Sequence, residues 1–158
     1  MRRHFVKLIK EKMNEDEKIH LITADLGYGM FNDFDDLYKD RFHNVGAAEQ
    51  LMVGCAIGLA QEGKIPLCYS ITPFLLYRPF ELIRNYLQHE HYNVKLIGAG
   101  RDNDYSHDGI SHWAHDDEDI IGRFFSIDIY KPRDNDELDG CFSKMLYSGA
   151  PSYLNLRR

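Results

Sequence analysis

The sequence lacks long apolar runs, and its longest apolar stretches fall far short of the roughly 20 residues that a membrane-spanning helix needs. The first residues are amphipathic and then acidic, without the apolar core or cleavage site of a secretory signal peptide. We therefore expect no membrane segment. Cysteine is scarce too, because Cys55, Cys68 and Cys141 are widely spaced and form no Cys-x-x-Cys pair. They are predicted to be buried free thiols in a reducing, cytoplasmic compartment.

The chain also lacks an excess of basic residues. Its 158 residues include 19 Lys and Arg against 25 Asp and Glu, which gives a net charge of −6. Proteins that bind nucleic acids usually present a basic face to the phosphate backbone, so no nucleic-acid partner is expected. Hydrophobic residues make up 44% and charged residues 28%, a mixture typical of globular proteins. The length predicts a single domain over residues 1–158.

Helical periodicities and short apolar runs alternate along the chain. Helices are predicted over residues 3–14, 33–38, 46–62, 79–88, 117–124 and 134–146. Strands are predicted over residues 19–24, 42–45, 66–71, 94–99, 125–130 and 152–156. This alternation indicates a doubly wound α/β fold, with a mainly parallel sheet covered by helices on both faces. Such a sheet places its ligand site along the edge where the strands end.

The most informative segment runs from Arg41 to Gly63. It predicts a short strand, a glycine turn and a long helix that carries one carboxylate, Glu49, in its first turn. The apolar face of this helix is predicted to contain Ala48, Leu51, Met52, Cys55 and Leu59. Glu49 either interacts favourably with the helix dipole or shares a proton with a ligand nitrogen in a buried cleft. Gly54 and Gly58 are expected to allow close packing against a neighbouring element.

Two further segments are candidates for ligand contacts. The polar stretch over residues 100–116 is long for a loop in a compact domain, which is typical of functional loops. Three interpretations stay open: a metal site formed by Asp108, His112 and His115, a polar lip for a hydroxylated ligand, or a solvated loop. Phe74 follows a predicted strand, where its ring either stacks on a ligand ring or packs in the core.

Five motifs, taken in order, resemble the pyrimidine-binding domain of transketolase-type thiamine diphosphate enzymes over nearly the whole chain. They are TADLGYG at 23–29, RFHNVGAAEQLMVGCAIGLA at 41–60, YRPFELIRN at 77–85, DGISH at 108–112 and PSYLNLRR at 151–158. The resemblance implies thiamine diphosphate as cofactor. It also implies transfer of a two-carbon ketol unit, or related cleavage or ligation next to a carbonyl, on a sugar or sugar derivative.

The resemblance implies roles for single residues as well. Glu49 matches the glutamate that bonds the aminopyrimidine ring and favours the imino tautomer that activates the cofactor. Phe74 matches the aromatic residue that stacks on this ring, and Asp25 and Tyr77 are expected to bind the cofactor too. Catalysis is assigned to Glu49 and His112. The substrate-binding residues that the resemblance implies are Arg3, His107, Asp108, His112 and Arg157.

One family feature is missing, because no GDG motif with a downstream asparagine is present to hold Mg²⁺ and the diphosphate. We therefore expect no metal site, no diphosphate-binding domain and no C-terminal domain in this chain. The resemblance then implies a split subunit, with Mg²⁺ and the diphosphate held by a diphosphate-binding partner chain and homodimers joined in a heterotetramer. Gly29 and Gly100 replace residues that contact a sugar phosphate, so a phosphorylated ketose is not implied. The alternatives are a subunit of deoxyxylulose phosphate synthase or another thiamine diphosphate lyase, a non-catalytic assembly or regulatory paralogue, and a metal-dependent hydrolase.

Overall fold

The computed structural model describes residues 1–158 and contains one six-stranded sheet. Its strands are β1 (Ile19–Thr23), β2 (Phe42–Asn44), β3 (Ile65–Ile71), β4 (Lys95–Ala99), β5 (Asp128–Tyr130) and β6 (Ser152–Leu156). They lie in the order β2-β1-β3-β4-β6-β5, and every neighbouring pair is parallel. The predicted α/β architecture with a parallel sheet is confirmed.

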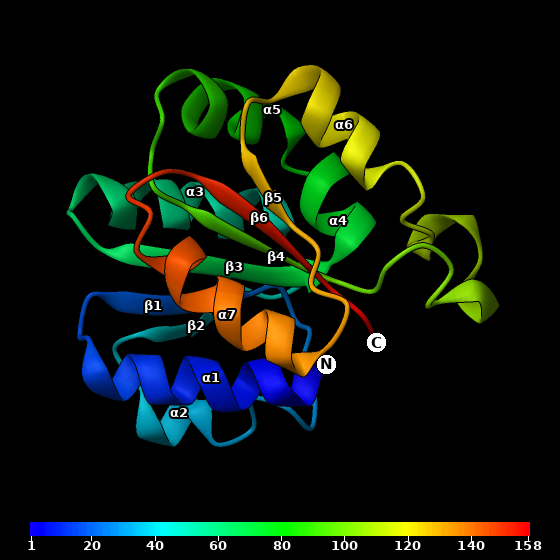
Figure 1. Ribbon diagram of the computed structural model, residues 1–158. Coiled ribbons are helices and arrows are strands. Elements are labelled where there is room, and N and C mark those ends of the chain that lie inside the picture. The colour runs from blue at the N-terminus through cyan, green and yellow to red at the C-terminus, as the bar shows by residue number, and fades with distance from the viewer.

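Helices cover both faces of this sheet (Figure 1). They are α1 (Arg2–Glu15), α2 (Phe34–Leu37), α3 (Glu49–Gln61), α4 (Thr72–Tyr77), α5 (Phe80–Leu82), the π-helix η1 (Ile83–His89), α6 (Asp117–Phe124) and α7 (Asn135–Leu146). Helices α1, α2 and α7 pack on one face (Figure 1), and α3, α4, η1 and α6 pack on the other.

The strands β1, β3, β4 and β6 contribute to two separate hydrophobic cores, because successive side chains of a strand point to opposite faces. Leu21 and Ile97 belong to a cluster of 19 buried residues under α1, α2 and α7. Their neighbours Ile22 and Leu96 belong to a cluster of 17 buried residues under α3, α4 and α6. Burial on both faces explains the nearly continuous apolar strands of the sequence. None of the helices has the length and apolarity that crossing a membrane requires.

Helix α4 is not predicted from the sequence. It follows β3 without a loop, and Pro73 lies in its first turn, where the missing backbone N–H leaves no hydrogen bond unmade. The helix predicted over residues 79–88 is instead the short α5 followed by the π-helical η1. The chain therefore continues as helix directly from the end of β3, and Phe74 lies on that helix.

The predicted buried face of α3 is only partly right, because Met52 is buried but Leu51 and Cys55 are not. The buried residues of this helix are Glu49, Met52, Val53, Ala56 and Ile57. Leu51, expected in the core, is 54% exposed, and Cys55 is exposed as well. Apolar and small residues surround most of this helix, so the periodicity does not distinguish the core-facing side.

The expectations for the cysteines and for the two glycines of α3 are also only partly right. Of the three free thiols, Cys68 is buried, Cys141 is half-buried and Cys55 is exposed, so the expectation that all three are buried is wrong. Gly54 faces α5, because a Cβ atom built there would lie 3.8 Å from Leu82 Cδ1. A Cβ atom at Gly58 would meet nothing within 4 Å, so close packing is found at one glycine of the pair.

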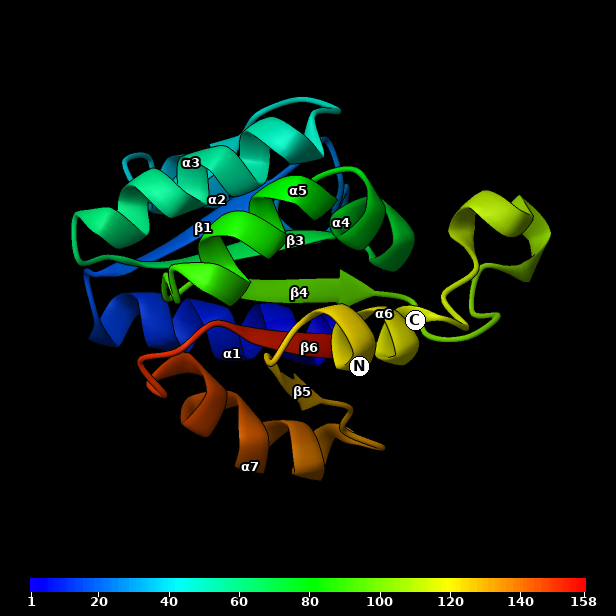
Figure 2. The same cartoon turned by 90° about the horizontal axis from the view of Figure 1, so that it is seen from above.

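The carboxyl edge of the sheet gathers the segments that the sequence patterns singled out. The first turns of α3 and α4, the start of α1 and both chain termini lie there (Figure 1). The segment over residues 100–116 projects from this edge as a lobe (Figure 2). An isolated antiparallel bridge between Asp102 and Ala114 closes its base. Inside the lobe are two short 3-10 helices, η2 (Ser106–Asp108) and η3 (Ile110–His112).

Candidate active site

Glu49 begins α3, and only 2% of it is exposed. Gly46, with a φ of +74°, forms the turn that leads from β2 into this helix, a conformation that favours glycine. Glu49 Oε2 accepts a hydrogen bond of 2.7 Å from Arg78 Nη1, and Oε1 accepts a longer one of 3.4 Å from Ser70 Oγ. A carboxylate that only interacted with the helix dipole would be expected to stay exposed to solvent. Glu49 is instead buried and paired with Arg78.

Arg78 joins Glu49 to the aromatic residue of α4. Its Cζ atom lies 3.8 Å from the centroid of the Phe74 ring, which places the guanidinium on the face of that ring. His112, from η3, contacts the same ring edge to face, with centroids 4.9 Å apart. The structure thus brings together Glu49, Phe74 and His112, three residues singled out from the sequence. It adds Arg78, which lies in the motif at 77–85 but was assigned no role from the sequence.

The remaining loop residues lie farther out on the lobe. His107 Nε2 lies 3.1 Å from Asp108 Oδ2, and both side chains are exposed to solvent. The Tyr77 hydroxyl donates a hydrogen bond to the Asp116 carboxylate. Burial, together with this bond, raises the pKa of Tyr77. Tyr77 thus ties α4 to the end of the lobe.

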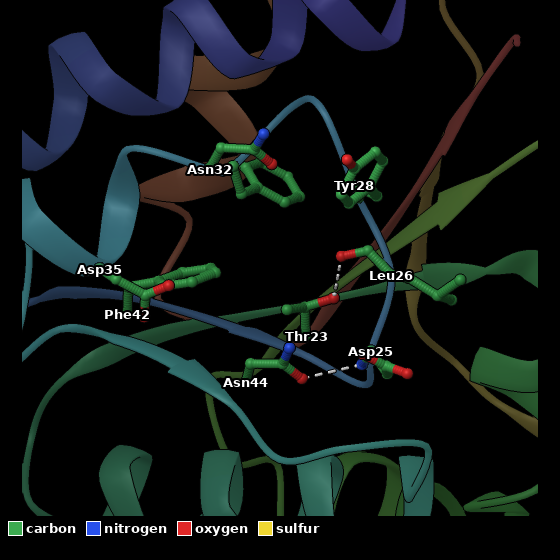
Figure 3. A pocket seen from close by; sticks show the side chains of 10 residues that line it. Thr23, Asp25, Leu26, Tyr28, Asn32, Asp35, Phe42 and Asn44 are labelled. Carbon is green, nitrogen blue, oxygen red and sulfur yellow. Dashed lines mark hydrogen bonds between the residues drawn. The ribbon is translucent and has the colours of Figure 1, made fainter.

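Asp25 lies two residues after the end of β1 and lines a small cavity of about 140 Å³ (Figure 3). Its φ of +55° is uncommon for a residue with a side chain. The backbone N–H of Asp25 donates a 2.9 Å hydrogen bond to Asn44 Oδ1, and Thr23 Oγ1 donates a 2.9 Å bond to the Leu26 carbonyl. Polar side chains at the ends of β1 and β2 therefore fix this turn at the edge that also carries Glu49.

A larger cavity, of about 620 Å³, lies at the amino-terminal end of α1. Three arginines line it, Arg2, Arg3 and Arg158, and Arg2 Nη1 donates a 2.7 Å hydrogen bond to the Tyr105 hydroxyl. The positive end of the α1 dipole adds to their charge, so the cavity attracts anions. Arg158 lines this cavity, whereas Arg157, the residue singled out from the sequence, does not.

The whole chain, residues 1–158, matches the family model described as transketolase, pyrimidine binding domain. The chain belongs to this family. It is 30% identical to the 6-deoxy-6-sulfo-D-fructose transketolase subunit of Clostridium sp. (strain MSTE9), over 100% of this chain and 49% of that protein. It is 33% identical to an apulose-4-phosphate transketolase subunit of Actinobacillus succinogenes, over 75% of this chain and 38% of that protein. The chain thus spans about half the length, or less, of these relatives.

Solved transketolases share the fold. One split-gene transketolase, described as an inactive β4 tetramer, superposes with a TM-score of 0.86 at 30% identity, covering 99% of this chain and 51% of that chain. Transketolase from Campylobacter jejuni superposes with a TM-score of 0.88 over 99% of this chain and 25% of that chain, at 16% identity, which shows the fold alone. The resemblance stated from the five sequence motifs is therefore confirmed.

The site of this transketolase-type domain fits the ring of thiamine diphosphate. A buried carboxylate can exchange hydrogen bonds with ring and amino nitrogens, and an aromatic face suits a stacked flat ring. Glu49 and Phe74 supply these two features. No group of three or more His, Cys, Asp or Glu side chains is placed to hold a metal ion. Asp108, His112 and His115 therefore do not form the metal set considered from the sequence.

Proposed function

We propose that this chain supplies the aminopyrimidine-binding half of a thiamine diphosphate-dependent, transketolase-like active site. The observation that carries the proposal is the Glu49 carboxylate, 2% exposed at the start of α3 and linked through a single guanidinium to the face of Phe74. A carboxylate and an aromatic face at the carboxyl edge of a parallel sheet lie where α/β folds bind their ligands.

The chemistry of electron withdrawal belongs to the cofactor, which serves as the electron sink when bound. The residues of this chain orient the ring and move one proton. Glu49 shares a proton with the ring nitrogen, and Ser70 Oγ, 3.4 Å from Oε1, restrains the carboxylate. Phe74 orients the ring by stacking, with Tyr77 and Asp25 at the periphery of the cofactor site. Because Glu49 is buried, water competes little for its hydrogen bond.

For the substrate, we propose a sugar or sugar derivative with an anionic end. The cavity lined by Arg2, Arg3 and Arg158 can pair with a phosphate or sulfonate group. The two relatives are named for a sulfonated fructose and a sugar phosphate, both of which carry such a group. The lobe residues His107, Asp108 and His112 then contact substrate hydroxyls. Arg157, one residue from the cavity, adds to the positive potential.

For the assembly, we propose that a diphosphate-binding partner chain completes the site and holds Mg²⁺, with two copies of this chain in a heterotetramer. The two relatives are described as transketolase subunits, which supports a partner chain. The split-gene transketolase that assembles as a β4 tetramer is described as inactive, which supports dependence on a second kind of chain.

A second candidate is a deoxyxylulose phosphate synthase-like condensation. The chain is 30% identical to 1-deoxy-D-xylulose-5-phosphate synthase of Shouchella clausii over 92% of this chain and 22% of that protein. Both reactions use the same ring activation, so Glu49 and Phe74 do not separate them. The substrates that the assembled enzyme converts would separate them.

The test of the proposed function is hydrogen–deuterium exchange at the cofactor C2 atom in the assembled enzyme, with the diphosphate-binding chain of the same organism. Glu49→Gln should slow this exchange by at least about a hundredfold, because an amide cannot share the proton. Glu62→Gln, a change at the exposed end of the same helix, is the matched control and should leave the rate unchanged. Equal rates in Glu49→Gln and wild type would show that Glu49 does not activate the cofactor.

A further inference from the structure

The guanidinium of Arg78 satisfies two contacts at once. Its Nη1 atom donates to Glu49 Oε2 at 2.7 Å, and its Cζ atom lies 3.8 Å from the centroid of the Phe74 ring. These contacts are made by a flat group that bears N–H donors and lies over an aromatic face. An aminopyrimidine ring that stacks on Phe74 and bonds Glu49 has the same shape and the same kind of donor.

The two groups cannot occupy this place together. A stacked ring lies within about 3.5–4 Å of the face that it covers, where carbon atoms reach their optimal separation. The guanidinium already occupies that layer and takes the Oε2 acceptor. His112 contacts the same ring in a T-shaped arrangement, with centroids 4.9 Å apart, so Phe74 is in contact with both Arg78 and His112.

We propose that Arg78 is a placeholder for the cofactor ring, which pairs with Glu49 and covers Phe74 until the ring displaces it from both. This inference rests on the proposed function. Arg78 is a positioning residue in the cofactor-free chain, because it keeps the buried carboxylate paired and oriented toward the place of the ring. On displacement, the ring takes over the acceptor and the aromatic face, so neither group is left without a partner.

The exposure of the two partners explains which of them moves. The Glu49 side chain is 2% exposed and fixed in the first turn of α3, whereas the Arg78 side chain is 47% exposed at the end of α4. A buried carboxylate without a partner is strongly unfavourable, so Glu49 needs a cation or a donor at all times. Arg78 can rotate into solvent without losing its hydration, because half of its surface already faces water.

The experiment is a titration of the isotope-labelled full chain with 4-amino-5-hydroxymethyl-2-methylpyrimidine, the aminopyrimidine half of thiamine. The two Nη signals of Arg78, identified by their absence from the spectrum of Arg78→Lys, report whether the guanidinium is held. In the free chain we expect two separate signals, because the bound guanidinium rotates slowly and its two Nη groups interchange slowly. At a saturating concentration of the probe we expect one averaged signal, because the two Nη groups of the released guanidinium interchange at least tenfold faster. Two unchanged signals at saturation would overturn the proposal.

Affinity gives the second measurement. Arg78→Met removes the competing head group while keeping the length of the side chain, so the probe should bind about three- to tenfold more tightly than to wild type. Arg84→Met removes an exposed arginine that bonds only its neighbour Asn85 and should leave the affinity unchanged. Weaker binding to Arg78→Met would overturn the proposal, because it would make Arg78 a clamp on the ring.

The same measurements separate this inference from the proposed function. Binding that Glu49→Gln weakens, with Arg78 held throughout, would leave the proposed function standing and refute the placeholder. Absence of binding to wild type and to Arg78→Met alike would refute the placeholder, and the C2 exchange of the assembled enzyme would still decide the proposed function. The wild-type titration needs only the conservative Arg78→Lys variant, for the assignment of the signals, so a destabilised Arg78→Met protein does not remove the test.

Discussion

The pairing of Arg78 with Glu49 predicts a measurable coupling in stability. Arg78→Met leaves the buried carboxylate with only the 3.4 Å contact to Ser70 Oγ. Breaking a fully buried ion pair from one side costs about 3–5 kcal/mol. Here the Arg78 side chain is 47% exposed, so solvent already screens part of the attraction. We therefore expect Arg78→Met to lower the free energy of unfolding by about 2 kcal/mol.

A double-mutant cycle isolates this interaction. Glu49→Gln removes the buried charge, so adding Arg78→Met to that variant should cost about 0.5 kcal/mol or less, and the coupling energy should be about 1.5 kcal/mol. Urea denaturation followed by circular dichroism, at one protein concentration, measures all four proteins. With a typical slope of about 2 kcal/mol per molar urea, the Arg78→Met midpoint should move by about 1 M.

Arg84→Met, at an exposed position, controls for the general loss of an arginine. A coupling energy near zero, with Arg78→Met as stable as wild type, would refute the argument. It would mean that the buried carboxylate does not depend on this cation, and the placeholder described above would lose its energetic basis.

Three further predictions concern the substrate lobe, the cofactor and the response to acid. His112→Ala should lower kcat/KM for the sugar by about 1–3 kcal/mol of lost hydrogen bonding. Exchange at the cofactor C2 atom without sugar should stay normal in that variant, and loss of exchange with unchanged sugar kinetics would reverse the assignment. The chain without its partner should bind thiamine diphosphate with a Kd of roughly millimolar or weaker, since ring contacts alone remain; calorimetric titration with Mg²⁺ measures this, and micromolar binding would contradict the split site. Burial, together with the neighbouring His43, lowers the pKa of His20 to about 4. The unfolded chain then takes up a proton below about pH 6.5 that the folded chain takes up only near pH 4, so acid favours unfolding. The free energy of unfolding should fall by up to about 3 kcal/mol over that interval, at about 1.36 kcal/mol per pKa unit. His20→Asn should flatten this part of the urea-denaturation profile, and an unchanged pH slope in that variant would exclude His20 as its source.

The sheet and the carboxylate of the site could be predicted because strong local patterns encode them. Strands such as residues 94–99 are apolar almost without interruption, which predicts burial on both faces, and the structure shows it. Glu49 is a single charge after a glycine turn, at the start of an otherwise apolar helix. The position of Phe74 after a strand placed it at the carboxyl edge. Each of these signals is confined to a few neighbouring residues, so it can be recognised in the sequence without knowledge of tertiary contacts.

The features that the sequence did not predict depend on contacts between distant elements. The buried side of α3 is chosen by the sheet, and the apolar Leu51 carried the same local signal as Met52 although only Met52 is buried. Arg78 resembles an ordinary surface charge until α4 turns it toward Glu49. The arginine cavity joins both ends of the chain, Arg2 and Arg158, which no local pattern brings together.

The six residues of α4 connect the two halves of the proposed site. Phe74 and Arg78 are four residues apart, a spacing that places two side chains on one side of a helix. Arg78 contacts Glu49, and Phe74 contacts His112 of the lobe. Tyr77 adds a second connection to the lobe through Asp116. Release of Arg78 by a bound ring would therefore change the surroundings of Phe74, and with them the position of His112. Cofactor binding and the placement of the substrate lobe are thus expected to be coupled through this short helix.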